Sequence, residues 1–160
     1  MKALFQTIVV AVSGSEASIG AAKYGIAMAR LYRCRLVAVY VIDTATLREL
    51  LMSKIFVEDE SAEYEKSLEE NGQRYLNYVE ELAQKKGVAV EKVLRRGAVA
   101  TEVIHAAEDC QADLILLGGF EEKESFRDAL SRQHRDILKN SRCSILVVKD
   151  PEIDFRYRKL

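Results

Sequence analysis

The chain has 160 residues, of which 49% are hydrophobic and 31% are charged, and its formal net charge is −1. This length and composition predict one soluble globular domain with a sizeable core. The balanced charge speaks against a nucleic-acid-binding surface, and no apolar run reaches the roughly 18 residues that a membrane-spanning helix needs. We therefore expect neither nucleic acid nor a membrane as a partner.

The start of the chain and its cysteines favour the cytoplasm. Residues 1–7 lead directly into a strand-like run rather than into an apolar signal segment. Cys34, Cys110 and Cys143 are scattered and form no CxxC pair, as is typical of small buried residues in a reducing compartment. The sequence therefore predicts a cytoplasmic protein without a metal site.

Five short apolar runs follow one another along the chain as predicted strands. They lie at residues 7–12, 36–41, 88–94, 114–117 and 145–148. The third run alternates between apolar and polar residues and suits an edge strand, while the other four are continuous and suit strands buried on both faces. Helical periods separate the runs, so we predict an open, doubly wound α/β domain with five parallel strands in the order 3-2-1-4-5 and helices on both faces.

The predicted helices are marked by apolar stripes between the strands. These stripes lie at residues 19–29, 64–83, 99–107 and 126–138. Ser13 and Glu16 have the spacing of a capping box at the first helix, and Ser125 and Asp128 have it at the fourth. The sequence therefore gives Ser13 and Ser125 a structural role at helix starts.

The remaining segments are less regular. Thr44 is predicted to cap a short additional helix, with a loop around residues 57–60. We expect residues 1–150 to form the domain and residues 151–160, which hold the only proline, to form a C-terminal tail.

The glycine pair Gly118–Gly119 follows the fourth run, where an open α/β sheet would place a phosphate-binding loop. Residues 120–128 contain no further glycine but three glutamates, Glu121, Glu122 and Glu124. Phosphate is held by backbone N–H groups that glycine lets approach closely, and carboxylates repel it. The loop thus has the position of a nucleotide site without its chemistry.

Five segments in this order resemble the universal stress protein family. They are IVVAVSGSEAS from Ile8, VYVID ending at Asp43, GAVATEVI from Gly97, ADLILLG ending at Gly118, and SRCSILVV ending at Val148. The resemblance covers about residues 7–148. It implies an adenine pocket between the ends of the first and fourth strands, and dimers that meet through the last strand.

Family members that bind ATP carry G-x2-G-x9-G-[ST] after the fourth strand. Gly118 supplies the first glycine, whereas Glu121, Ser131 and Arg132 stand at the other three positions. Ser13 stands where binding members place an Asp against the nucleotide. The resemblance therefore implies a branch with a degenerate ATP-binding loop and no bound cofactor, while ATP or AMP binding through the altered loop is the alternative.

The switch point of the predicted sheet should still form a cleft that admits an apolar, uncharged or adenine-sized ligand. The candidate binding residues are Val12, Ser13, Val41, Gly118, Gly119 and Arg132. We expect this site to belong to a binding or regulatory module in the stress response.

We expect no catalytic residues. His105 and His134 lie far apart in the sequence with no nucleophile and carboxylate arranged around either, and both are predicted to lie on helix surfaces. Residues 13–18 also faintly resemble the S-G-G-x-D-S loop of ATP pyrophosphatases, but Ser15 and Ala17 replace its second glycine and its Asp. An adenylating enzyme is therefore the less favoured reading.

A homodimer is predicted through the last strand. The run from Ile145 to Val148 is wholly apolar, yet the predicted order places it at a sheet edge, and soluble proteins cover or pair such edges. Two copies related by a two-fold axis would pair these strands antiparallel, and Phe155 and Tyr157 of the tail could reach the other copy. A further protein partner is left open.

Overall fold

The computed structural model of the chain describes residues 1–54, 57–119 and 129–160. Its strands are β1 (Thr7–Val12), β2 (Arg35–Asp43), β3 (Val90–Gly97), β4 (Leu114–Gly118) and β5 (Ser144–Val148). Its helices are α1 (Glu16–Tyr32), α2 (Thr44–Met52), α3 (Glu58–Gln84), α4 (Val99–Asp109), α5 (Ala129–Asn140) and α6 (Ile153–Arg158).

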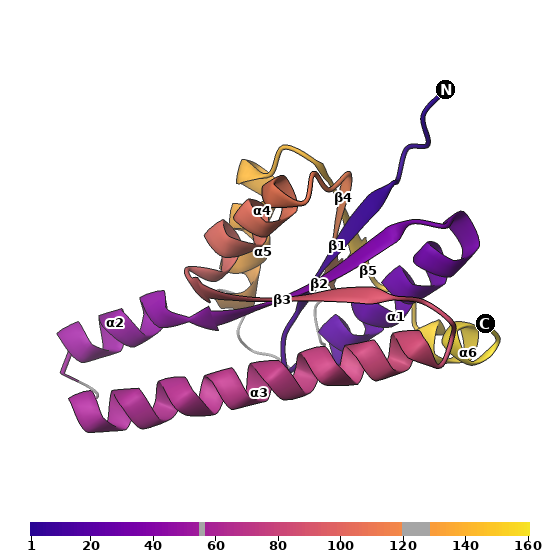
Figure 1. Cartoon of the computed structure of the whole chain (residues 1–160). Helices are drawn as coiled ribbons and strands as arrows, with labels where there is room; N and C mark the ends of the chain where they lie inside the picture. Colours follow the sequence, from indigo (N-terminus) through magenta and orange to yellow (C-terminus); the bar gives the residue numbers. More distant parts are fainter. Residues whose placement is uncertain (55–56, 120–128) are drawn as a thin grey trace.

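The strands form one parallel sheet in the order β3-β2-β1-β4-β5 (Figure 1). The central strand β1 pairs with both β2 and β4, so that Val9 lies between Val37 and Ile115. The predicted fold class and strand order are confirmed. The helices that follow β1 and β4 pack on opposite faces of the sheet. The connections after these two strands therefore diverge, which makes the carboxyl ends of β1 and β4 the switch point of the sheet.

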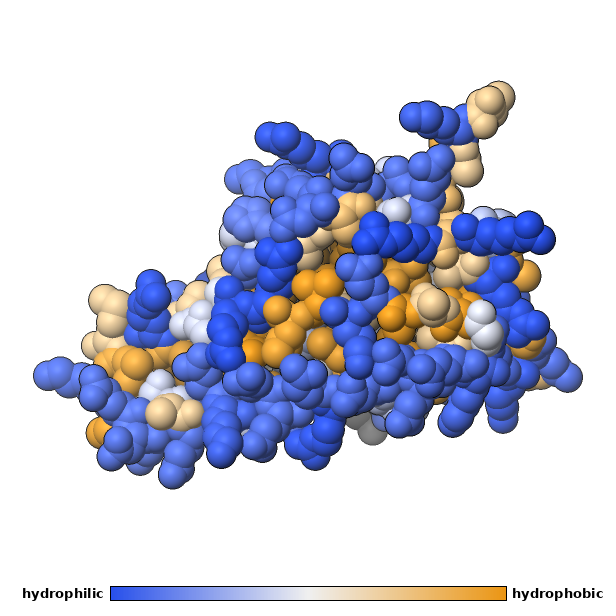
Figure 2. All heavy atoms as spheres, viewed as in Figure 1, coloured by the Kyte–Doolittle hydropathy of each residue, from blue (hydrophilic) through white to orange (hydrophobic). Residues whose placement is uncertain are grey.

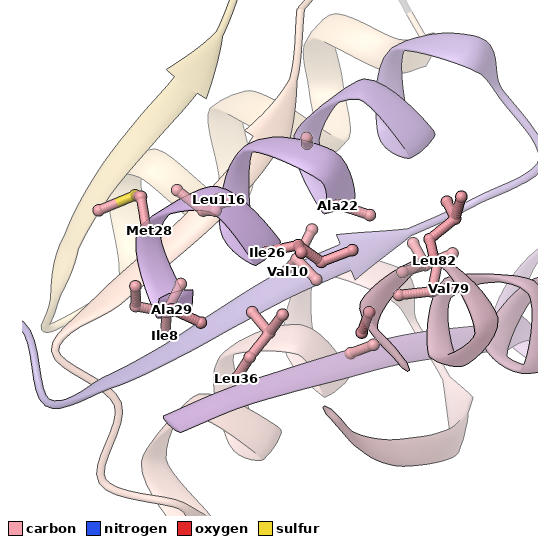
Figure 3. Close-up of a cluster of buried hydrophobic side chains, with 14 of the residues drawn as sticks. Ile8, Val10, Ala22, Ile26, Met28, Ala29, Leu36, Val79, Leu82 and Leu116 are labelled. Atoms are coloured by element: carbon pink, nitrogen blue, oxygen red, sulfur yellow. The ribbon is translucent and has the colours of Figure 1, made fainter. Parts of the chain in front are cut away.

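Alternate side chains of the sheet enter two separate cores. Ile8 and Val10 of β1 point to the face covered by α1, α3 and α6, where they meet Ile26 and Val79 (Figure 3). Val9 points to the opposite face, which α4 and α5 cover. Continuous apolar strands are required because both faces are buried, as the sequence predicts.

Helix α3 spans 27 residues, which is longer than its apolar stripe suggests. The predicted loop at residues 57–60 is wrong, because α3 already begins at Glu58. Glu58, Asp59 and Glu60 occupy its first turn, where negative charge favours the helix dipole. The first part of α3 extends with α2 beyond the sheet (Figure 1), and hydrophilic side chains cover the outer side of α3 (Figure 2).

Two predicted helix caps are also wrong by one or two residues. The cap of α1 is Ser15, whose hydroxyl accepts from the Ser18 N–H at 3.1 Å, so the capping box of Ser13 and Glu16 does not form. The cap of α2 is Asp43 instead of Thr44, because the Asp43 carboxylate accepts from the Thr46 N–H at 3.0 Å. Ser15 lies in the loop that follows β1, and Asp43 is the last residue of β2. Both caps therefore lie at the edge of the sheet where its switch point is.

The third strand and the C-terminal segment differ in detail from their prediction. Strand β3 begins at Val90, two residues after its predicted start, and continues to Gly97, three residues beyond its predicted end; it is an edge strand as expected. Residues 153–158 form the short helix α6, which packs on α1 of its own chain. Tyr157 is buried there and its hydroxyl donates to the Leu82 carbonyl at 2.7 Å, so this ring is not available to another copy.

The predicted cap at Ser125 and Asp128 and the acidic residues Glu121, Glu122 and Glu124 lie outside the described residues. Within the ranges that are described, no helix combines the length and the apolar character required to cross a bilayer.

Candidate functional site

A cleft of about 260 Å³ opens at the carboxyl ends of β1, β2 and β4. Five of the six predicted binding residues line it, namely Val12, Ser13, Val41, Gly118 and Gly119. The sixth, Arg132, is exposed and lines a neighbouring hollow between α2, α4 and α5. The structure therefore brings the strand-end residues together and leaves the arginine outside the cleft.

Three serine side chains form a hydrogen-bonded network on the β1 side of the cleft. The buried Ser18 hydroxyl accepts from the Ser13 N–H at 3.0 Å and donates to the Ser13 carbonyl at 2.8 Å. The Ser13 hydroxyl lies 3.0 Å from the Ser15 hydroxyl. These bonds fix the loop from β1 to α1, and they hold the two other hydroxyls at the cleft wall.

The glycine pair has a packing role at this site. A Cβ atom on Gly118 would lie 2.6 Å from the backbone carbon of Ala17, and one on Gly119 would lie 2.8 Å from the Val148 carbonyl oxygen. Both distances are shorter than real Cβ contacts. Glycine is therefore needed here so that the end of β4 can approach the start of α1 and the end of β5.

His134 of α5 belongs to the cleft, so its predicted place on the helix surface is wrong. The half-buried ring lines the cleft, and Nε2 lies 2.8 Å from the Gly118 carbonyl oxygen. Because a carbonyl oxygen only accepts hydrogen bonds, Nε2 carries the proton. His105, in contrast, is on the surface of α4 as expected, with its Nδ1 3.9 Å from Glu102. The sequence held no signal for His134, whose partner is a backbone atom.

The opposite wall of the cleft is mainly apolar. Tyr40 of β2 is buried and stacks on Tyr75 of α3 with ring centroids 6.3 Å apart. Burial raises the pKa of the Tyr40 phenol, with a smaller contribution from Tyr75. Gly72 faces the Tyr40 ring so closely that a Cβ atom would lie 2.6 Å from it. Apolar residues of four elements also line the cleft, namely Val41, Leu68, Val99 and Ile137.

Asp43 is the one Asp, Glu, Lys or Arg among the described residues that line the cleft. Its carboxylate stands at the end of β2 and caps α2 through Thr46. No lysine or arginine lines the cleft within the described ranges. Nor do the described residues contain a group of three or more His, Cys, Asp or Glu side chains that could hold a metal ion. The cleft is therefore apolar with a single negative charge at its edge.

The sequence matches a known family over most of its length. Residues 4–149 match the universal stress protein family. A relative, Universal stress protein MJ0531 of Methanocaldococcus jannaschii, is 31% identical over 156 residues, which cover 93% of this chain and 85% of that protein.

Solved structures show the same fold. A protein from the universal stress protein family of Burkholderia pseudomallei matches with a TM-score of 0.72 and 23% identity, covering 94% of this chain and 100% of that one. The universal stress protein of Archaeoglobus fulgidus in complex with dAMP matches with a TM-score of 0.62 and 17% identity, covering 92% and 100%. A family protein of Arabidopsis thaliana with AMP bound matches with a TM-score of 0.65 and 13% identity, covering 92% and 94%. The chain belongs to the universal stress protein family.

Proposed function

We propose that the protein is a non-enzymatic binding module whose cleft takes an uncharged, adenine-sized ligand and does not hold ATP. The observation that carries this proposal is the charge of the cleft. Its described lining has no cation, and its one fixed charge is the Asp43 carboxylate. A triphosphate would bring several negative charges to a site that supports none of them.

The size of the cleft supports the same ligand class. Its volume of about 260 Å³ lies just below the range of about 300–1,000 Å³ that is usual for small-molecule sites. This volume suits a base or a nucleoside better than a nucleoside triphosphate. The sequence of residues 120–128 adds three glutamates and an aspartate against one lysine and one arginine, which again disfavours phosphate.

A binding role is favoured over catalysis because the serine hydroxyls and the His134 Nε2 of the cleft make structural hydrogen bonds. The Ser18 hydroxyl bonds the backbone of Ser13, and the Ser15 hydroxyl caps α1. His134 Nε2 is held by the Gly118 carbonyl. A nucleophile needs an adjacent base to activate it, and these serines bond one another and the backbone instead.

A second candidate is an adenine mononucleotide. Its support is that the similar proteins of Archaeoglobus fulgidus and Arabidopsis thaliana have structures with dAMP and AMP. In this case the adenine would occupy the same cleft and the phosphate would have to lie outside it, towards the exposed Arg132.

Calorimetry and thermal unfolding with adenine, adenosine, AMP and magnesium ATP test both candidates. We expect adenine or adenosine to bind, and a ligand at 100 times its Kd should stabilise the fold by about 2.7 kcal/mol. Magnesium ATP with a Kd below about 10 μM, or about −7 kcal/mol, would contradict the proposal. Binding of AMP alone would favour the second candidate.

A pair of variants ties any binding to the cleft. Val41→Phe places a larger side chain in the cleft lining and should abolish binding. Val93→Phe is the matched control, because Val93 is half-buried against the same core but lies outside the cleft lining. Binding that survives Val41→Phe would place the ligand elsewhere.

A further inference from the structure

We infer that Asp43 makes the cleft selective for a ribonucleoside, since its carboxylate would accept hydrogen bonds from sugar hydroxyls and repel a phosphate. This inference rests on the proposed function, because it needs the base in the cleft. It adds the chemical class of the ligand and the residue that selects this class by hydrogen bonding.

The position of Asp43 carries the first step. The residue is the last of β2 and borders both the cleft and the neighbouring hollow, so a group that leaves the cleft in this direction passes the carboxylate. Asp43 is half-buried, which holds it in place without removing it from reach. In open α/β domains that bind dinucleotides, an acidic side chain in a comparable place bonds the ribose hydroxyls.

The hydrogen bonds of Asp43 carry the second step. One carboxylate oxygen accepts from the Thr46 N–H at 3.0 Å, and the other accepts from the Thr46 hydroxyl at 2.7 Å. An ionised carboxylate has about four lone-pair sites, so each oxygen keeps acceptor capacity. The two bonds to Thr46 also fix the orientation of the carboxylate before a ligand arrives.

Charge carries the third step. An ionised acceptor makes hydrogen bonds about twice as strong as a neutral one, which favours sugar hydroxyls as donors. The same charge repels a phosphate on the 5′ carbon, and no lysine or arginine in the described cleft lining offsets it. Adenosine should therefore bind more tightly than AMP.

Binding of five compounds to the wild-type protein tests the inference by calorimetry. The compounds are adenine, adenosine, 2′-deoxyadenosine, 3′-deoxyadenosine and AMP. We expect adenosine to bind about tenfold more tightly than AMP, than adenine and than at least one of the deoxynucleosides. AMP binding as tightly as adenosine would overturn the inference.

The Asp43→Asn variant tests the residue itself. Asn caps helices as well as Asp does, so the start of α2 is retained while the charge is removed. We expect this variant to bind adenosine about fivefold to tenfold more weakly and to lose most of its preference for adenosine over AMP. Glu108→Gln is the matched control, because Glu108 is an exposed acid of α4 that lines neither the cleft nor the neighbouring hollow, and it should leave both affinities unchanged.

The outcomes separate this inference from the proposed function. If adenine and all nucleosides bind equally, or if Asp43→Asn keeps the wild-type preference, Asp43 does not read the sugar and the cleft still binds the base. If none of the five compounds binds, both the proposed function and this inference are wrong.

Discussion

Gly118 cannot carry a side chain, because backbone atoms of α1 lie where its Cβ atom would be. The neighbouring atoms are the carbonyl group of Ala17 and the amide nitrogen of Ser18, at the start of α1. Backbone cannot rotate away as a flexible side chain can. The glycine thus keeps β4 and α1 in close contact at the edge of the cleft.

We therefore expect Gly118→Ala to lower the free energy of unfolding by about 1–3 kcal/mol, as overpacking does. Gly20→Ala is the matched control, because its Cβ atom would meet only Ile153 at 3.6 Å in the interior of α1. This control should stabilise the helix by about 0.5–1 kcal/mol. Urea unfolding of both variants measures the difference, and an equally stable Gly118→Ala protein would show that β4 and α1 can move apart.

Ser18 is another residue whose role is set by backbone groups. Its hydroxyl is buried and is the partner of the Ser13 N–H and carbonyl. Ser18→Ala would leave this N–H without its partner, so we expect a loss of about 1–3 kcal/mol in the free energy of unfolding. Ser67→Ala on the exposed side of α3 should change it by less than about 0.5 kcal/mol. Equal effects in urea unfolding would mean that solvent replaces the Ser18 hydroxyl.

At the scale of elements, two lysines outside α6 contact α6 and hold it to the domain. Lys23 of α1 pairs with Asp154 at 2.6 Å, and the Lys23 ammonium lies 5.6 Å from the centre of the Tyr157 ring. The Lys86 ammonium lies 4.9 Å from the centre of the same ring. Helix α6 is therefore packed against α1 of the domain.

The Lys23–Asp154 pair predicts a pH dependence. The hydrogen bond from Lys23, followed by its charge, lowers the pKa of Asp154 in the folded protein. The unfolded chain thus takes up this proton first as the pH falls, and the stability that the pair provides above the unfolded pKa is lost. Because Asp154 is largely exposed, the contribution should be below about 1 kcal/mol.

Urea unfolding at about pH 6 and about pH 3, on either side of the ordinary carboxyl pKa, measures this contribution. Asp154→Asn should lose less stability than the wild type between these two pH values. Glu63→Gln in the exposed part of α3 serves as the control and should follow the wild type. Identical losses in all three proteins would show that solvent screens the pair completely.

The elements also show how far the sequence could be used for prediction. Strand β1 has its predicted bounds, since five apolar residues in a row, Ile8–Val12, end at the polar residues Thr7 and Ser13. The start of α3 was not predictable from periodicity, because its first turn is acidic and has no apolar stripe. At the site, strand order alone brought Val12, Val41 and Gly118 together, whereas the role of His134 depends on a backbone carbonyl that no sequence pattern marks.

For the whole molecule, the outer edge of β5 predicts how two copies would meet. Strand β5 is bonded to β4, and no other described strand lies on its second side. Ile145, Leu146 and Val147 are only partly buried, and an apolar open edge favours pairing with another strand. We propose that the protein is a homodimer through this strand, with the two copies related by a two-fold axis.

Val147→Lys should therefore give a monomer or an aggregating protein in light scattering. Val57→Lys is the matched control, because Val57 is 61% exposed and directly precedes α3, whose first part extends beyond the sheet (Figure 1), and it should leave the assembly unchanged. A Val147→Lys protein that stays a dimer would move the interface to another surface, with the exposed side of α3 as the next candidate.

The length of α3 has a consequence for the exchange of its amide hydrogens with solvent. At about 1.5 Å per residue the helix is about 40 Å long, but of its described buried residues only Ser61 lies before Gly72. The later turns contribute Leu76, Val79 and Leu82 to the core. The early amides should therefore exchange through local opening within a short labelling time, while the late ones wait for global unfolding. One continuous helix would then behave as two segments, and deuterium uptake measured along α3 would locate the boundary near the edge of the sheet.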